Sequence, residues 1–182
     1  MDNFESDLAN LLINMKKVCS PVCISNIASE LLDRTHIINL NNNMPKFSIT
    51  ENCGLYYFEA NFQNSIYGTL EEFGNAWKGI NTKSPSFYVK QSKLHSNLFK
   101  TTNFIPFYIG KSENINTRIN EHIFLEGSDT YALRLMERLN ILGGIDFKYS
   151  YLELKLDPKL YFLLAEFESL IRADIIPIIG KQ

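Results

Sequence analysis

The sequence predicts an α+β fold in which a small three-stranded sheet is flanked by helices. Short runs rich in aromatic and β-branched residues, bounded by glycine or turn residues, predict strands over 54–60, 104–109 and 147–154. Apolar residues at helical spacing predict helices between and after these runs. From Gly54 onward the order is therefore strand, strand, helix, helix, strand, helix.

We divide the chain into an N-terminal helical extension, residues 1–53, and a main domain, residues 54–182. In the extension, apolar spacing predicts a helix over 4–17, and Ser20-Pro21 supplies an N-cap and a first-turn proline for a second helix over 21–33. Two short consecutive helices permit a helix-turn-helix motif. No residue at the turn is specific for that motif, so plain packing is favoured.

The main domain holds a long insertion, residues 61–103, between its first two strands, with a helix expected from Leu70 to Trp77. The second strand is apolar enough to lie centrally in the sheet. After it the sequence predicts helices over 113–124 and 129–142, the third strand, and a last helix that Asp157-Pro158 opens and that runs to about Asp174.

Charge is distributed unevenly along the chain, although the formal net charge is only −2. The acid-free stretch from Gly74 to Ser112 carries six lysines, so the rest of the chain holds 12 basic and 20 acidic residues. A polyanion responds to the local field, which makes this stretch a candidate phosphate-contacting surface, with a solvated loop as the alternative. The lysines are Lys78, Lys83, Lys90, Lys93, Lys100 and Lys111.

Other classes of protein are disfavoured. The chain has no run of 18 apolar residues and no secretory signal at Met1, so we expect no membrane partner and a cytoplasmic location. Cys19, Cys23 and Cys53 are odd in number and lack the second pair that a zinc site needs, which favours reduced thiols.

Two tripeptides and their spacing carry a family resemblance. Gly54-Leu55-Tyr56 and Tyr108-Ile109-Gly110 fall on the first two predicted strands. Arg118 follows Tyr108 by ten residues, His122 follows Arg118 by four, and Glu168 precedes Pro177 by nine. In this order and register the chain resembles the GIY-YIG nuclease superfamily over residues 54–180. The resemblance implies a mainly antiparallel sheet and a metal-dependent DNA endonuclease.

The helix predicted over 113–124 agrees with that resemblance. Ile115, Ile119 and Ile123 form one apolar stripe that would seat the helix on the sheet. Asn114, Arg118 and His122 repeat with the same four-residue step at the edge of that stripe. An arginine there can bind a phosphate with two donors and stabilise charge that develops during cleavage.

The resemblance implies that Tyr56 is the general base for the attacking water, with Tyr108 beside it. A phenol can act so only if nearby positive charge favours phenolate, and Lys111 and Arg118 are expected to supply it. The opposite-face neighbour Tyr57 is not a substitute, because alternate residues of a strand point to opposite faces. The alternative is that Tyr56 and Tyr108 are ordinary sheet residues whose hydroxyls lie at the rim of the sheet.

Glu168 is the metal ligand that the resemblance implies, and Glu166 is the competitor two residues away. One carboxylate with waters and a substrate phosphate suits Mg²⁺, or Mn²⁺ in its place. Spacing to Pro177 favours Glu168. No organic cofactor is expected.

The chain departs from the family pattern in two places. Gly180 stands where family members often carry an asparagine. Tyr56 and Tyr108 lie 52 residues apart, much farther than in the compact family loop. We interpret the intervening insertion as a DNA-contacting arm, in which aromatic residues are interleaved with Lys78, Lys83, Lys90, Lys93 and Lys100. The aromatic set is Trp77, Phe87, Tyr88 and His95.

Within that superfamily the chain most resembles the restriction-endonuclease branch, which implies a sequence-specific restriction or genome-defence nuclease, bacterial or phage-encoded, that acts on double-stranded DNA. One site cuts one strand, so double-strand cleavage calls for a homodimer on DNA or for sequential nicking. A homing, mobile-element or repair nuclease is an alternative with the same core. The other alternative is a non-catalytic DNA-binding protein that kept the fold, which the glycine at position 180 supports.

Overall fold

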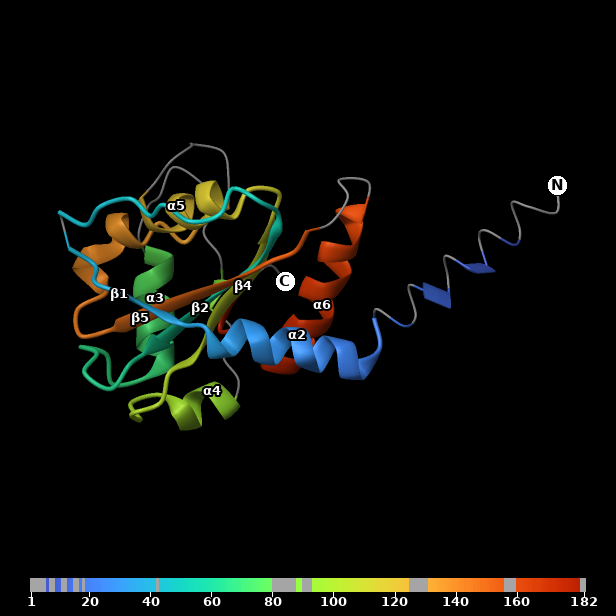
Figure 1. Ribbon diagram of the computed structural model, residues 1–182. Coiled ribbons are helices and arrows are strands. Elements are labelled where there is room, and N and C mark those ends of the chain that lie inside the picture. Colours follow the sequence, from blue (N-terminus) through green and yellow to red (C-terminus); the bar gives the residue numbers. More distant parts are fainter. Residues whose placement is uncertain are drawn as a thin grey trace.

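The computed structural model describes residues 6, 9–10, 13–14, 17, 19–41, 43–79, 88–89, 93–124, 131–155 and 160–180 (Figure 1). Within these ranges no helix has the length and apolar character needed to cross a membrane. The elements are α2 (Pro21–Asp33), β1 (His36–Ile38), β2 (Gly54–Asn61), α3 (Leu70–Gly79), β3 (Tyr88–Val89), α4 (Lys93–Leu98), β4 (Ile105–Ser112), α5 (Ile115–Phe124), the 3₁₀ helix η1 (Leu135–Ile141), β5 (Asp146–Glu153), α6 (Phe162–Ile175) and β6 (Ile179–Gly180).

The main sheet has four strands in the order β1-β5-β2-β4, and every neighbouring pair is antiparallel. The α+β class is therefore confirmed, whereas the expected number of three strands is wrong. The fourth strand, β1, comes from the N-terminal extension and pairs with β5 through three residues. A second sheet joins β3 of the insertion to β6.

Strand β4 lies at an edge of the main sheet, so the expectation that it lies centrally is wrong. It is nevertheless apolar, because α6 and the segment that leads into β6 cover its outer side. The amide of Ile178 donates to the carbonyl of Pro106 at 3.0 Å. This cover explains why the sequence of an edge strand resembles that of a central one.

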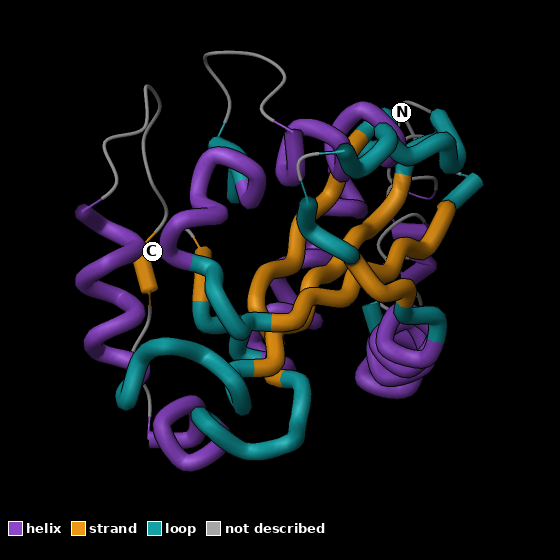
Figure 2. Tube along the Cα trace, turned by 90° about the vertical axis from the view of Figure 1, so that its left-hand side faces the viewer, coloured by secondary structure: helices purple, strands orange, loops and turns teal. Residues whose placement is uncertain are grey.

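The two faces of the sheet belong to different apolar clusters, and Figure 2 shows the strands with helices on either side. Leu55 and Tyr57 pack with α2 and α6, whereas Tyr56 and Phe58 pack with α3, α5 and η1. Because alternate residues of a strand point in opposite directions, Tyr57 faces away from Tyr56, as predicted.

Helix α2 has the predicted bounds, and its buried residues Ile24, Ala28 and Leu31 lie against the sheet and α6. The Ser20 hydroxyl accepts the N–H of Cys23 at 3.4 Å, which makes Ser20 the N-cap. This helix therefore packs on the sheet, as favoured over a helix-turn-helix. The helix predicted over 4–17 lies mostly outside the described residues.

The segment before β2 fixes the position of α5. The N–H of Phe47 donates to Asn120 Oδ1 at 2.9 Å, and the N–H of Ile49 donates to Asn116 Oδ1 at 3.1 Å. Asn114 caps the start of the helix by accepting the N–H of Thr117 at 2.9 Å. Side chains of α5 thus tie the helix to the N-terminal extension, and Asn114, the residue before α5, caps its first turn.

Two predicted helices differ in the structure. The helix predicted over 129–142 is the 3₁₀ helix η1, and Arg134 before it has a left-handed backbone with a φ of 54°. The last helix begins at Phe162, and the Asp157-Pro158 pair expected to open it lies outside the described residues. The helix expected from Leu70 to Trp77 is confirmed as α3.

Candidate active site

The glycines of the two signature tripeptides allow close approaches of other groups. A Cβ at Gly54 would lie 2.1 Å from the carbonyl oxygen of Leu152, and a Cβ at Gly110 would lie 2.2 Å from Tyr56 Oη. Tyr56 and Gly110 are partners in the β2–β4 register. The phenol of Tyr56 therefore crosses the neighbouring strand at the one residue type without a side chain and reaches α5.

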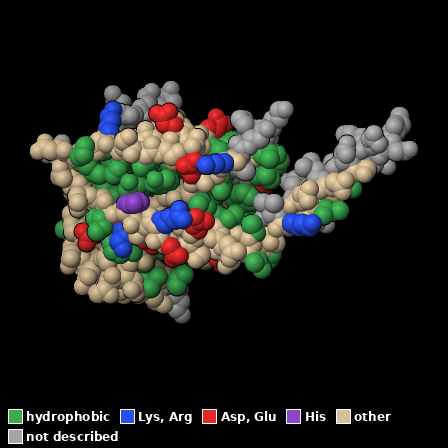
Figure 3. All heavy atoms as spheres, in the orientation of Figure 1, with side chains coloured by type: hydrophobic (Ala, Val, Ile, Leu, Met, Phe, Trp, Pro, Cys, Tyr) green, Lys and Arg blue, Asp and Glu red, His purple; other side chains and the backbone are tan. Residues whose placement is uncertain are grey.

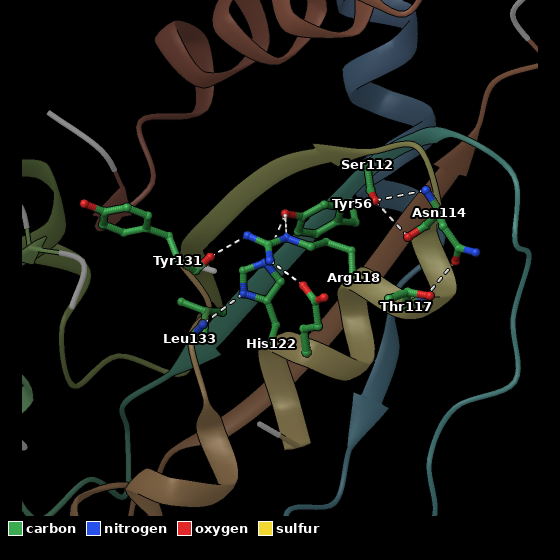
Figure 4. A network of polar contacts seen from close by, with 9 residues as sticks. Tyr56, Ser112, Asn114, Thr117, Arg118, His122, Tyr131 and Leu133 are labelled. Atoms are coloured by element: carbon green, nitrogen blue, oxygen red, sulfur yellow. Dashed lines mark hydrogen bonds and ion pairs between the residues drawn. The ribbon is translucent and has the colours of Figure 1, made fainter. Parts of the chain in front are cut away.

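Tyr56 Oη lies between two donors from α5 (Figure 4). His122 Nε2 is 3.0 Å away, and Arg118 Nε donates to the same oxygen at 3.3 Å. The backbone N–H of Leu133 donates to His122 Nδ1 at 3.0 Å, so that nitrogen is an acceptor. The neutral imidazole then carries its proton on Nε2, and His122 donates it toward Tyr56.

Burial decides the protonation of this pair. It raises the pKa of Tyr56 well above its ordinary value; the neighbouring Tyr108 raises it further, and the charge of Arg118 lowers it. It lowers the pKa of His122 well below its ordinary value, and Arg118 adds to that effect. With these shifts Tyr56 is a phenol and His122 is neutral at neutral pH. The expectation that positive charge would prevail at Tyr56 is therefore wrong for these surroundings.

Arg118 holds the centre of the network. Besides Tyr56, its guanidinium binds the carboxylate of Glu121 at 2.5 Å and the carbonyl oxygen of Tyr131. These bonds use three of the five N–H donors of an arginine. The side chain is 19% exposed, and two N–H donors remain beyond these three bonds.

Tyr108 links this network to the carboxylate on α6. Its ring lies 6.1 Å from that of Tyr56 and 4.9 Å from that of His122. Burial raises the pKa of Tyr108; the charges of Arg118 and Arg172 and a hydrogen bond from Tyr56 lower it, and Glu168 raises it. The predicted pair of tyrosines is thus in contact, with Glu168 close enough to act on it.

Glu168 forms an ion pair with Arg172, one helical turn further along α6. Burial raises the pKa of Glu168, while Arg172, Lys111 and Arg118 lower it. Lys111 Nζ lies 4.6 Å from the ring centroid of Tyr161. The structure therefore places Lys111 with Glu168, whereas the sequence led us to expect it at Tyr56.

Only one of the two candidate carboxylates lies at this site. Glu166 is exposed and lies near Cys19, whose thiol pKa is raised by burial and raised further by the charge of Glu166. In the described ranges no three His, Cys, Asp or Glu side chains gather to hold a metal ion. Glu168 can supply one carboxylate ligand, which fits an ion that takes its other ligands from water and phosphate, such as Mg²⁺.

The described residues include only part of the expected DNA-contacting arm. Lys78 and Lys100 are exposed, and Lys100 Nζ donates to the carbonyl of Ser65. Trp77 and His95 are buried, so they do not belong to an exposed arm. On the face in Figure 3, basic and acidic side chains are interspersed. Three residues of the arm lie outside the described residues, namely Lys83, Phe87 and Lys90. For two others the structure describes the backbone but not the side chain, namely Tyr88 and Lys93.

Gly180, where the family often has an asparagine, is buried in β6 and pairs with Tyr88 of the insertion. Its backbone therefore ties the C-terminal segment to the insertion. Sequence reasoning missed Glu121 and Arg172, both partners of predicted site residues. Spacings of three and four residues on a helix were the available signal for these ion pairs.

Comparison with known proteins gave no match, whether to models of protein families, to curated proteins or to solved structures. The resemblance to GIY-YIG nucleases therefore depends on the residues and their spacing in the sequence alone.

Proposed function

We propose that this protein is a metal-dependent endonuclease that hydrolyses phosphodiester bonds in double-stranded DNA. The observation that carries the proposal is the position of Tyr56 Oη between the N–H donors of His122 and Arg118, 3.0 and 3.3 Å away. A buried phenol that only fills a core usually has a hydrogen-bond partner, but here two donors, one of them charged, converge on its oxygen. Two donors directed at one phenolic oxygen stabilise the phenolate, which is the form a base requires.

In the proposed reaction Tyr56 takes a proton from water as the water oxygen bonds to phosphorus and one P–O ester bond breaks. Arg118 has two N–H donors beyond those in its three bonds, and these would bind a phosphate oxygen more strongly as its negative charge increases. Tyr56 must first lose its own proton, and the hydrogen bond that it shares with Tyr108 offers a relay in which Tyr108 would release its own proton to solvent water as it takes that of Tyr56. Formation of the phenolate would then accompany DNA binding.

Glu168 would hold Mg²⁺ or Mn²⁺ with water and phosphate oxygens as the other ligands. The bound ion would stabilise charge on the leaving oxygen. Arg172 already occupies the Glu168 carboxylate, so the arginine and the ion compete for it. Lys111 and Arg118 add positive charge nearby, which favours an arriving phosphate and disfavours a cation that arrives without one.

Within this proposal we favour a sequence-specific restriction or genome-defence enzyme, with a homing, mobile-element or repair nuclease as the alternative. A non-catalytic DNA-binding protein is the second candidate. The observation that favours it is that Arg118 is already bonded within the chain to Glu121, Tyr131 and Tyr56. Cleavage separates the two.

The test incubates the purified protein with supercoiled plasmid and with phage DNA, in Mg²⁺, in Mn²⁺ and in EDTA. We expect nicked or linear products only with metal. Discrete bands indicate sequence specificity, and a smear indicates a non-specific nuclease. Binding to DNA without any metal-dependent product across several substrates would contradict the enzyme and support the binding protein.

A further inference from the structure

A buried arginine lies behind the catalytic network. Arg138 of η1 is 1% exposed, and its guanidinium carbon lies 4.1 Å from the ring centroid of Trp77 in α3. Its NH1 donates to the carbonyl of Trp77 at 2.8 Å, and its Nε donates to the carbonyl of Leu133 at 3.1 Å. Arg138 therefore joins the insertion helix to the segment that passes His122.

That segment sets the tautomer of the histidine. The Leu133 residue whose carbonyl accepts from Arg138 also donates its N–H to His122 Nδ1 at 3.0 Å. The next residue, Arg134, has a left-handed backbone, a conformation that costs a side-chain-bearing residue about 1 kcal/mol or more. Because the neighbouring backbone is strained, we infer that the contact with Arg138 holds the Leu133 peptide in place.

Packing alone does not explain an arginine at this position. Burial lowers the pKa of Arg138 to about 10, a sign that the surroundings disfavour its charge. Replacing a buried charged group by an apolar side chain of similar volume is often neutral or stabilising. A methionine would fill this space, whereas only a planar group with several donors binds both carbonyls and stacks on the indole.

We propose that Arg138, held by Trp77, is a positioning residue that fixes the Leu133 peptide so that His122 keeps its proton on Nε2 and donates it to Tyr56. Its effect on cleavage rests on the proposed function, whereas its effect on the tautomer does not. The insertion then serves the active site from inside the core through α3.

The first test reads the tautomer by nitrogen-15 NMR of the imidazoles, since the chain has only three histidines to assign. In the wild-type protein His122 should show a protonated Nε2 and an unprotonated Nδ1 at neutral pH. In Arg138→Met the signals should move toward a mixture of tautomers. The control is Phe73→Leu, a core change in α3, the helix that carries Trp77, which should leave the His122 signals unchanged.

The second test is the pH profile of DNA cleavage. The groups that face Tyr56 are Tyr108 from β4 and Arg118 and His122 from α5. Loss of the donated Nε2 proton removes stabilisation from the phenolate, so the acid limb of kcat should move up by about one pH unit in Arg138→Met. At pH 7 kcat should fall about tenfold with KM unchanged. Phe73→Leu should keep the wild-type profile.

Arg138→Lys, which can still donate to the Leu133 carbonyl but cannot also bind the Trp77 carbonyl and stack on the indole, should restore both readouts only in part. Should the methionine variant not fold, Arg138→Leu, which also has no donor, takes its place with the same expected shifts. Wild-type His122 signals in a folded Met or Leu variant would overturn the inference, whatever the activity. Shifted signals in a protein that never cleaves DNA would support the positioning role and contradict the proposed function.

Discussion

Replacement of Gly110 by alanine tests the geometry that brings Tyr56 to α5. The new Cβ would lie 2.2 Å from Tyr56 Oη, and an ordinary contact begins at 3.4 Å, so the hydroxyl must move by about 1.2 Å (3.4 minus 2.2). Such a shift breaks the contacts with His122 and Arg118. Overpacking costs about 1–3 kcal/mol and buried donors without acceptors cost about as much again. We expect a loss of about 3 kcal/mol in the free energy of unfolding.

Chemical and thermal unfolding measure this loss, which corresponds to about 6–12 °C in Tm for a chain of this length. Gly79→Ala is the matched control, because a Cβ there meets nothing within 4 Å and α3 ends at that residue. In a Tyr56→Leu background, which removes the hydroxyl and shortens the side chain, the cost of Gly110→Ala should shrink by about 1 kcal/mol or more. If Gly110→Ala proves as stable as Gly79→Ala, the placement of Tyr56 is wrong.

Three further predictions concern chemistry, pH and binding. Tyr56→Phe should lower kcat about 100-fold or more with little change in DNA affinity, measured by single-turnover cleavage and by binding titration; normal cleavage would remove Tyr56 as the base. The pKa of His122 is lowered in the folded state, so stability is fully present above about pH 6.5 and falls below it by about 1.4 kcal/mol per pH unit. Urea unfolding against pH should show this slope in wild type and in the control His36→Gln, where the side chain is exposed, but not in His122→Gln. Reversing three insertion lysines to glutamate should weaken DNA binding and lessen its dependence on salt, and unchanged binding would leave them no role in DNA contact. These lysines are Lys83, Lys90 and Lys93.

The strands and helices with strong local signals could be predicted from the sequence. Ser20-Pro21 fixes the start of α2, and the alternation within β2 separates the faces of Tyr56 and Tyr57. Strand β1 has three residues, two of them exposed, so no alternation could identify it. It exists because β5 offers an edge for pairing, which is a property of the tertiary fold.

The insertion shows where composition misled. Lysines and aromatic residues together indicated an exposed arm, but the indole of Trp77 is buried under Arg138. Composition does not distinguish an aromatic residue that binds a partner from one that packs inside. The helical spacing of Leu70, Phe73 and Trp77, which places them on one face of α3, was the better guide.

The residues of the candidate site could be predicted better than its electrostatics. The family resemblance and the spacing along α5 grouped Tyr56, Arg118 and His122, but their burial depends on everything packed around them. The raised pKa of Tyr56 therefore had no signal in the sequence. Lys111 lies one residue beyond the signature glycine of β4, and its direction toward Tyr161 depends on how α6 packs against that strand.

The central claim is metal-dependent DNA hydrolysis at this site, and the paired variants Glu168→Gln and Glu166→Gln test it most directly. Both change one carboxylate of α6 to an amide, but only Glu168 lies with Lys111 and Arg172. The measurement is the rate of supercoiled plasmid nicking in Mg²⁺. We predict that Glu166→Gln nicks at the wild-type rate and that Glu168→Gln loses at least 100-fold. Equal rates in the two variants, or no nicking by the wild-type protein, would contradict the claim.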